Sequence, residues 1–385
     1  MERENRRQSQ IHHGIAVLPQ GLEDAGAQEL STLGAKAVRP LRRAVAFDAD
    51  QACLYRLHLQ CRLPFRLLRE LASFPCDGRD SLYDGVQQAV DWERWLHPSM
   101  SFRVDATGSA QGLNHSHYSA LQVKNAIVDR QRDLWGERSS IDLNEPDLHL
   151  HLHLSRSGAV LSLDGCGGSL HRRGYRAAMG LAPLKENLAA GLIQRTGWDG
   201  TTPLVDPLCG SGTLLIEAAS LARGLCVGLQ RSFSLEGWAD FDPALWAAEE
   251  QRARQREQQH HPLPPIIGNE QDPAIADQAR SNVAAAGLSD CITIRCGDFR
   301  DLSLPAVPGT VVCNPPYGVR VGDHDGLEAL YTDLGQMLKA KASGWDAWIL
   351  SGNAGITGAL KMKASRRIPI SNGGIDCRWL HYHVR

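Results

Sequence analysis

From about residue 182 to the end of the chain, segments with the pattern of strands alternate with segments with the pattern of helices. Five short apolar runs occupy the strand positions, at 202–207, 264–270, 291–298, 309–318 and 344–352. Such alternation predicts a parallel sheet with helices on its faces. Two further strand patterns at 365–384 surround Asn372-Gly373-Gly374, a strong hairpin signal. This region therefore predicts an α/β, doubly wound sheet of seven strands that ends in an antiparallel hairpin.

The first half of the chain lacks this regular alternation. Residues 1–13 are polar and predict a disordered tail. Residues 14–58 and 59–165 each mix strand and helix patterns, which predicts two α+β units. A connector rich in Gly and Arg, 166–181, then leads to the α/β region at 182–385.

Composition excludes several classes of protein. No apolar run approaches the roughly 18 residues of a membrane-spanning helix, and the N-terminus lacks the apolar core of a signal peptide. The ten cysteines include no C-x-x-C pair, so we interpret them as reduced thiols of a cytoplasmic protein. The net charge of -2 argues against a protein that coats nucleic acid, although it allows a locally basic face.

The turn after the first apolar run contains Asp206, Cys209, Gly210, Gly212 and Thr213, in the order D-P-L-C-G-S-G-T. Glycines between a strand and a helix let the backbone turn tightly and approach a ligand closely. No Lys follows the second Gly, as a phosphate-binding loop requires. The loop therefore suits an adenosine-type ligand better than a triphosphate, and its alternative interpretation is a plain tight turn.

Acidic residues follow the next two strands. Glu270 ends the second strand, where a carboxylate can accept hydrogen bonds from both ribose hydroxyls of a nucleoside. An insertion at 224–262 lengthens its spacing from the glycine loop. Asp272 is near enough to take that role, but it also fits a helix cap before Pro273. Asp298, after the third strand, is placed either to bind an adenine amino group or to cap a turn.

The fourth strand leads into Asn314-Pro315-Pro316-Tyr317, at the sheet edge where doubly wound folds bind ligands. An amine conjugated to a base is a poor nucleophile because its lone pair is delocalised into the ring. The side-chain oxygen of Asn314 and the carbonyl of Pro315 can each accept one amine hydrogen, which turns the lone pair toward a methyl donor. The Tyr317 ring offers a face on which the base can stack. The motif predicts amine methylation, and its alternative interpretation is a Pro-rich structural loop.

These motifs resemble the amino-methylating branch of the S-adenosylmethionine-dependent methyltransferases. Residues 171–198, the glycine loop, N-P-P-Y-G and the ending N-G-G-I-D-C-R-W-L-H-Y-H-V are similar to the RlmL family of 23S rRNA guanine-N2 methyltransferases. The resemblance implies a Rossmann-like class I methyltransferase domain preceded by an N-terminal ferredoxin-like segment and a THUMP RNA-binding domain. Some family members carry a second methyltransferase domain. Because this chain stops at Arg385, we expect only the guanine-N2 activity.

The resemblance also implies roles for individual residues. Those of the glycine loop would line the methionine part of S-adenosylmethionine, Glu270 would hold its ribose and Asp298 its adenine. Asn314, Pro315, Pro316 and Tyr317 would hold the guanine. Lys185 and Asn187 match a helix that packs over the donor site, although a surface Lys and a polar helix-interior residue would look the same.

Any contact with RNA must use local basic clusters. We predict contacts from Lys124 and Arg130 in the THUMP region, and from Arg172, Arg173 and Arg176 in the connector, where solvated arginines are an equal alternative. The target guanine is expected to flip out of its stack. His149, His151 and His153 alternate with leucines along one strand, and we interpret them as a solvated face and expect no metal.

Three other functions remain open. A tRNA guanine-N2 methyltransferase can share this layout. A glutamine or DNA adenine amino-methyltransferase can share N-P-P-Y, although the long α+β region argues against both. A non-enzymatic RNA-binding protein with a dead methyltransferase fold is disfavoured by the intact motifs. The sequence gives no information on oligomeric state or on which guanine is modified.

Overall fold

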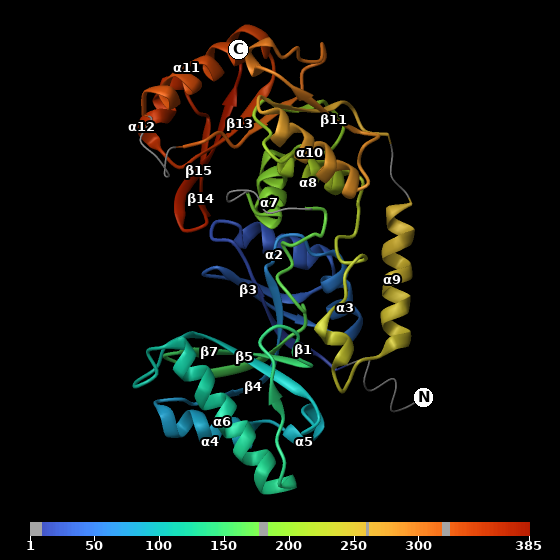
Figure 1. Ribbon diagram of the computed structural model, residues 1–385, viewed down its shortest axis with the longest axis vertical. Helices are drawn as coiled ribbons and strands as arrows, with labels where there is room; N and C mark the ends of the chain where they lie inside the picture. The colour runs from blue at the N-terminus through green and yellow to red at the C-terminus, as the bar shows by residue number, and fades with distance from the viewer. Residues whose placement is uncertain (1–9, 177–183, 259–261, 318–323) are drawn as a thin grey trace. The chain divides into compact units, whose positions relative to one another are not determined.

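A computed structural model describes residues 10–176, 184–258, 262–317 and 324–385 (Figure 1). The chain forms two compact units, each assembled from separate stretches of sequence. The first unit comprises the chain up to Val17, Ala27–Leu170 and Gly228–Arg252, and the second comprises Leu18–Gly26, His171–Val227 and Ala253–Arg385. Most of the tail predicted at 1–13 lies outside the described residues, but His12 and His13 already belong to the first strand. The end of the predicted connector, 177–181, also lies outside them.

The first unit is built on one eight-stranded sheet of order β2-β3-β1-β4-β8-β7-β5-β6. Both predicted α+β regions contribute to it, because β1 pairs with β4 in register through Ile15 and Leu68. Its strands are β1 (His12–Val17), β2 (Lys36–Leu41), β3 (Ala44–Ala49), β4 (Arg66–Phe74), β5 (Ser101–Gly108), β6 (Ser140–Ile141), β7 (Leu148–Ser155) and β8 (Gly158–Asp164).

Helices cover this sheet where its side chains are apolar. The four leucines of β7 are all buried, as the period-two pattern predicts for one face of a strand. Helix α6 packs against β5 and against α4, as Figure 1 also shows. The helices of the N-terminal half are α2 (Glu23–Thr32), α3 (Gln51–Gln60), α4 (Arg79–Ala89), α5 (Trp92–Trp95) and α6 (Ser116–Trp135).

Most of the predicted insertion belongs to the first unit. It contains the short helix η1 (Ser234–Gly237) and the charged helix α9 (Pro243–Glu257), and its residues 228–252 pack within this unit. The Arg69 guanidinium forms two hydrogen bonds with the Asp240 carboxylate, at 2.9 and 3.1 Å, and lies over the ring of Trp238. The Arg56 guanidinium is bound in the same two-bond manner by the buried Glu249 of α9. The insertion is therefore held by buried ion pairs as well as by apolar packing.

The second unit contains the predicted seven-stranded sheet, with order β11-β10-β9-β12-β13-β15-β14. The first five strands of that order are parallel, and β15 runs antiparallel to both β13 and β14. The α/β fold with a C-terminal hairpin is thus confirmed. The strands are β9 (Leu204–Asp206), β10 (Ile266–Glu270), β11 (Ile292–Cys296), β12 (Thr310–Cys313), β13 (Asp346–Ser351), β14 (Arg366–Asn372) and β15 (Ile375–His383).

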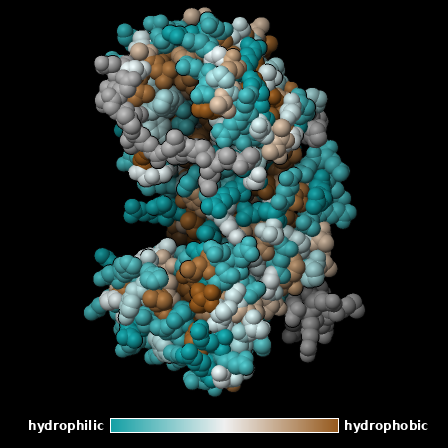
Figure 2. Space-filling model, in the orientation of Figure 1, coloured by the Kyte–Doolittle hydropathy of each residue, from teal (hydrophilic) through white to brown (hydrophobic). Residues whose placement is uncertain are grey.

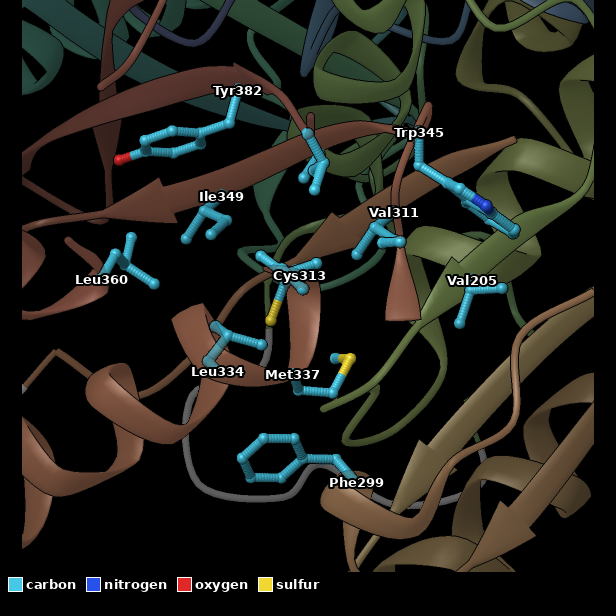
Figure 3. Packing of buried hydrophobic residues seen from close by; sticks show 14 of the residues in the cluster. Val205, Phe299, Val311, Cys313, Leu334, Met337, Trp345, Ile349, Leu360 and Tyr382 are labelled. Carbon is cyan, nitrogen blue, oxygen red and sulfur yellow. The ribbon is translucent and has the colours of Figure 1, made fainter. Parts of the chain in front are cut away.

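A buried apolar cluster joins this sheet to helix α11. Figure 3 shows Leu334 and Met337 of α11 facing Cys313 and Ile349 of the central strands, with Phe299 beside them. The remaining helices of the unit are α7 (Glu186–Thr196), α8 (Thr213–Ala222), α10 (Pro273–Ala285), η2 (Phe299–Asp301), α11 (His324–Lys341), α12 (Ala354–Thr357) and η3 (Gly358–Leu360). This packing fixes the strand ends from which the candidate site is built.

Hydrophilic side chains predominate on the face of the molecule drawn in Figure 2, with hydrophobic ones scattered among them. Within the described parts of the chain, no helix has both the length and the apolar character needed to cross a membrane.

We expect Asp240→Ala to destabilise the first unit by about 3–5 kcal/mol, because it leaves the Arg69 guanidinium buried without its carboxylate partner. The Arg69 side chain is only 3% exposed, so water cannot replace that partner. Urea unfolding followed by circular dichroism measures the loss. Asp133→Ala, which removes an exposed carboxylate of the same unit, is the matched control. Equal midpoints for the two variants would show that this ion pair does not hold the insertion.

Candidate functional site

Polar side chains meet where the parallel strands of the second unit end. Asp206 is the last residue of β9, Glu270 is the last of β10, and Asn314 directly follows β12. The sheet order reverses between β9 and β12, so that their following segments diverge to opposite faces. Ligands of doubly wound sheets bind in the crevice at such a reversal. The three side chains therefore stand at one ligand-binding edge.

The glycine loop adopts the backbone that its sequence predicts. Gly210 and Gly212 have φ values of +52° and +80°, a region that favours glycine, and Gly212 caps the start of α8. Two buried asparagines brace the loop from neighbouring elements. Asn269 Nδ2 donates to the Pro207 carbonyl at 3.3 Å, and Asn282 Nδ2 donates to the Ser211 carbonyl at 3.0 Å. Sequence reasoning missed both, although a polar residue inside the apolar β10 was a usable signal.

Two carboxylates lie beside this loop. Asp206 is buried, and its Oδ1 accepts from the Leu208 N–H at 3.1 Å. Burial, with a smaller contribution from the charge of Glu270, raises the pKa of Asp206 to about 8. The Glu270 carboxylate accepts from the Gly210 N–H at 3.2 Å and from the Asp272 N–H at 2.9 Å. Such a pair suits a ligand that brings a positive charge and hydroxyl donors.

The other two aspartates have structural partners. Asp272 caps α10 by accepting from the N–H groups of Ala274 and Ile275, as the Asp-Pro pattern predicts. Asp298 caps η2 and forms an ion pair with Arg300, whose hydrogen bonds hold the pKa of Asp298 below its usual range. An adenine amino group at Asp298 would have to share its carboxylate with this arginine.

The N-P-P-Y segment places one unpaired oxygen at the edge. Asn314 Oδ1 is buried, and no described residue donates a hydrogen bond to it. A buried acceptor of this kind costs about 1–3 kcal/mol if nothing pairs with it. Pro315 is buried and Pro316 exposed, while the half-buried Tyr317 has its hydroxyl bound to Asn372. Gly318 lies outside the described residues.

Two of the connector arginines require a correction. The sequence leaves Arg173 and Arg176 open as phosphate contacts or solvated arginines, but their side chains are only 5% and 12% exposed and pair with carboxylates of the same unit. Arg173 lies 3.6 Å from Glu217, and Arg176 lies 2.8 Å from Glu186. Both ions therefore contribute to packing within the unit.

Arg176 also reaches the glycine loop, since one of its Nη atoms donates to Thr213 Oγ1 at 2.8 Å. On the neighbouring helix, Lys185 is exposed at the N-cap of α7 and Asn187 is fully buried. Arg172 is exposed, Lys124 is partly buried in α6, and Arg130 pairs with Glu93 at 3.0 Å. These exposed or partly exposed cations remain predicted contacts.

The histidine strand is less solvated than predicted. His149 is buried, with its Nε2 2.9 Å from Asp105 and its Nδ1 3.6 Å from Asp164, so it is a paired structural histidine. His151 is partly buried, and only His153 is exposed. No set of three His, Cys, Asp or Glu side chains in the described ranges is arranged to hold a metal ion.

Comparison with proteins of known sequence gives close relatives. A provisionally named RNA methyltransferase of Synechocystis sp., slr0064, is 41% identical over 371 residues, covering 96% of each chain. The ribosomal RNA large subunit methyltransferases K/L of Syntrophotalea carbinolica and Vibrio cholerae are 40% and 38% identical over 96% of this chain. The chain spans about half the length of these two relatives, 53% in each case.

Solved structures agree with these relatives. SMU.472, a provisionally named methyltransferase complexed with SAH, matches with a TM-score of 0.87 and 27% identity, covering 98% of this chain and 99% of its own. A possible methylase from Clostridium difficile 630 matches with a TM-score of 0.88 and 26% identity over the same shares. Both matches extend over the two units rather than over the α/β sheet alone.

Three family models cover the chain in sequence. Residues 14–68 match the RlmL ferredoxin-like domain, 79–164 match the THUMP domain, and 173–381 match the RMKL-like methyltransferase domain. The last match spans more than half of the 385 residues. The chain therefore belongs to the RMKL-like methyltransferase family, with THUMP and RlmL ferredoxin-like domains before the methyltransferase domain.

Proposed function

We propose that this chain transfers a methyl group from S-adenosylmethionine to the exocyclic N2 amine of a guanine in 23S rRNA. The observation that carries the proposal is the buried Oδ1 of Asn314, at the sheet edge beside the glycine loop, to which no residue in the described part of the chain donates a hydrogen bond. The K/L relatives are named as methyltransferases of large-subunit ribosomal RNA, which supports RNA as the substrate. The THUMP match supports RNA as the partner.

S-adenosylmethionine is the methyl donor, and its sulfonium supplies an electrophilic methyl group. The SMU.472 structure, which resembles this chain along nearly its whole length, contains SAH, the same molecule without that methyl. The residues present fit such a ligand. The buried Asp206 carboxyl would bind its ammonium, and Glu270, whose carboxylate also accepts from the Gly210 N–H, would bind the ribose hydroxyls. The glycine loop leaves room for close approach of the methionine part.

The acceptor amine is handled by the N-P-P-Y segment. Asn314 Oδ1 and the Pro315 carbonyl would each accept one amine hydrogen, which draws the nitrogen lone pair out of conjugation. The Tyr317 ring would stack on the flipped base. Orientation does most of the work, because the amine proton leaves only after methyl transfer and no strong base is needed. Lys124, Arg130 and Arg172 are proposed to bind phosphates outside the reaction centre.

We expect Asn314→Ala to lower kcat on the order of 10²-fold or more while the Kd for the donor stays within twofold, since Asn314 touches only the acceptor. Single-turnover methylation and calorimetric titration with S-adenosylmethionine measure the two quantities. Asn144→Ala, at an exposed position of the first unit, is the control. Equal loss of donor affinity and rate would contradict the assignment.

The substrate class is tested by incubating the full chain with labelled donor and naked 23S rRNA, tRNA, DNA or protein. We expect label only in 23S rRNA, and mass mapping of the nucleotide to give N2-methylguanine. Label in tRNA alone would replace rRNA by tRNA as the substrate. Label that resists ribonuclease would point instead to DNA adenine or a protein glutamine.

Donor binding should depend on pH through Asp206. Because its pKa is about 8 without ligand, the carboxyl is mostly protonated at pH 7, and a cationic donor favours the charged form. Binding therefore releases a proton, so donor affinity rises with pH and approaches a tenfold gain per pH unit between about pH 6 and 7. Calorimetry in two buffers of different ionisation enthalpy counts the proton. Asp206→Asn is expected to bind more weakly and without proton release; wild-type binding without proton release would contradict this role.

A further inference from the structure

The hairpin turn after β14 does not depend on the Asn372 side chain. It is the last residue of β14 and pairs with Ile375, the first residue of β15. The two-residue loop between them is Gly373-Gly374, with φ values of +60° and +88°. Positive φ at both loop positions is the requirement of a type I′ hairpin turn, and the two glycines meet it. The turn therefore leaves the Asn372 side chain available for another contact.

That side chain reaches the N-P-P-Y segment. Asn372 Nδ2 donates to the Tyr317 hydroxyl at 2.7 Å, across 55 residues of sequence. Burial raises the pKa of Tyr317 to about 12, so the hydroxyl keeps its proton at neutral pH. The polar end of the tyrosine is thus bound by the hairpin and is not offered to a substrate.

The ring of Tyr317 is held by a second element. A Cβ placed on Gly352, just after β13, would lie 2.8 Å from Cδ2 of that ring and 3.2 Å from Ile375 Cγ2. Real side chains do not approach so closely, so the ring lies directly against the Gly352 backbone. The hairpin therefore holds the hydroxyl end of Tyr317, and Gly352 lies against its Cδ2 and Cε2 atoms, so that the ring has little freedom to move.

We propose that Asn372 is a positioning residue that fixes the plane of the Tyr317 ring before the acceptor base arrives. This rests on the proposed function, in which that ring stacks on the base. Because the Tyr317 ring is already fixed, no conformational entropy is lost in ordering it when the base binds. The fixed ring also holds the amine in line with the methyl group. Asn372 acts through Tyr317 and does not touch the donor, so its effect belongs to the acceptor step.

The test compares Asn372→Ser, whose side chain is too short to reach the hydroxyl, with Asp376→Asn, an exposed neighbour in the same hairpin. We expect Asn372→Ser to lower kcat about tenfold with the donor Kd and the Tm unchanged, and Asp376→Asn to leave all three unchanged. Tyr317→Phe removes the same hydrogen bond from the other side, so the double variant should lose no more than either single one. Additive losses, or wild-type kcat in Asn372→Ser, would overturn the proposal.

Gly352→Ala provides a second variant, which displaces the ring while the Asn372 side chain stays intact. We expect it to lower kcat with donor affinity preserved, and wild-type kcat would count against a fixed ring.

A spectroscopic measurement keeps this proposal separate from the proposed function. In wild type, the signal of the labelled ring carbon that bears the Tyr317 hydroxyl reports the hydrogen bond that this hydroxyl accepts from Asn372 Nδ2. Asn372→Ser should shift that signal and Asp376→Asn should leave it in place, and an unshifted signal in Asn372→Ser would refute the anchoring. If wild type methylates no RNA and Asn372→Ser still shifts the signal, the proposed function fails and the anchoring stands.

Discussion

The register of the parallel strands in the second unit is the constraint on which the candidate site depends. Because β9 pairs with both β10 and β12, the residues that leave these three strands emerge at one edge. Asp206, Glu270 and Asn314 come from positions as far as 108 residues apart in number, yet each needs only to follow its own strand. The sheet does the assembly, and the apolar cluster between it and α11 holds the sheet rigid. Shifting one strand by a residue would turn its functional side chain to the other face.

This dependence explains what could be predicted from the sequence. Local sequence patterns predict the succession of strands along the chain, the C-terminal hairpin and the glycine loop. The structure confirms the seven-stranded sheet. Asp272 was recognisable as a cap because its partners are two and three residues away. Residues that follow a strand directly are the ones for which local reasoning works, since the strand itself determines where they point.

Contacts between distant segments could not be predicted in the same way. Nothing local distinguishes Arg173, buried against Glu217, from an arginine of a solvated connector. The insertion could be recognised, but not its packing within the first unit, which depends on Arg69 and Asp240 across 171 residues. In the sequence, Asn372 looks like part of the hairpin turn. The structure shows that the two glycines make the turn and that the Asn372 side chain bonds to Tyr317 instead. In each case the role of the residue depends on a partner that is distant in the sequence, so the residue's own neighbours in the sequence do not reveal it.

Two polar groups at this edge of the sheet lower the stability of the fold. Asp206 is buried at a place that disfavours its charge, and Asn314 Oδ1 lacks a donor in the described chain. An apolar residue of similar size at either position would avoid the free-energy cost of burying a carboxylate or an acceptor without a donor. Selection for stability alone would therefore favour such residues. Asp206 ends β9 and Asn314 follows the neighbouring strand β12. The first suits a cation and the second an amine hydrogen, an arrangement that is expected if two ligands meet between them. Arg173 and Glu217 differ from them, because these two buried side chains carry opposite charges and lie 3.6 Å apart, so each offsets the charge of the other.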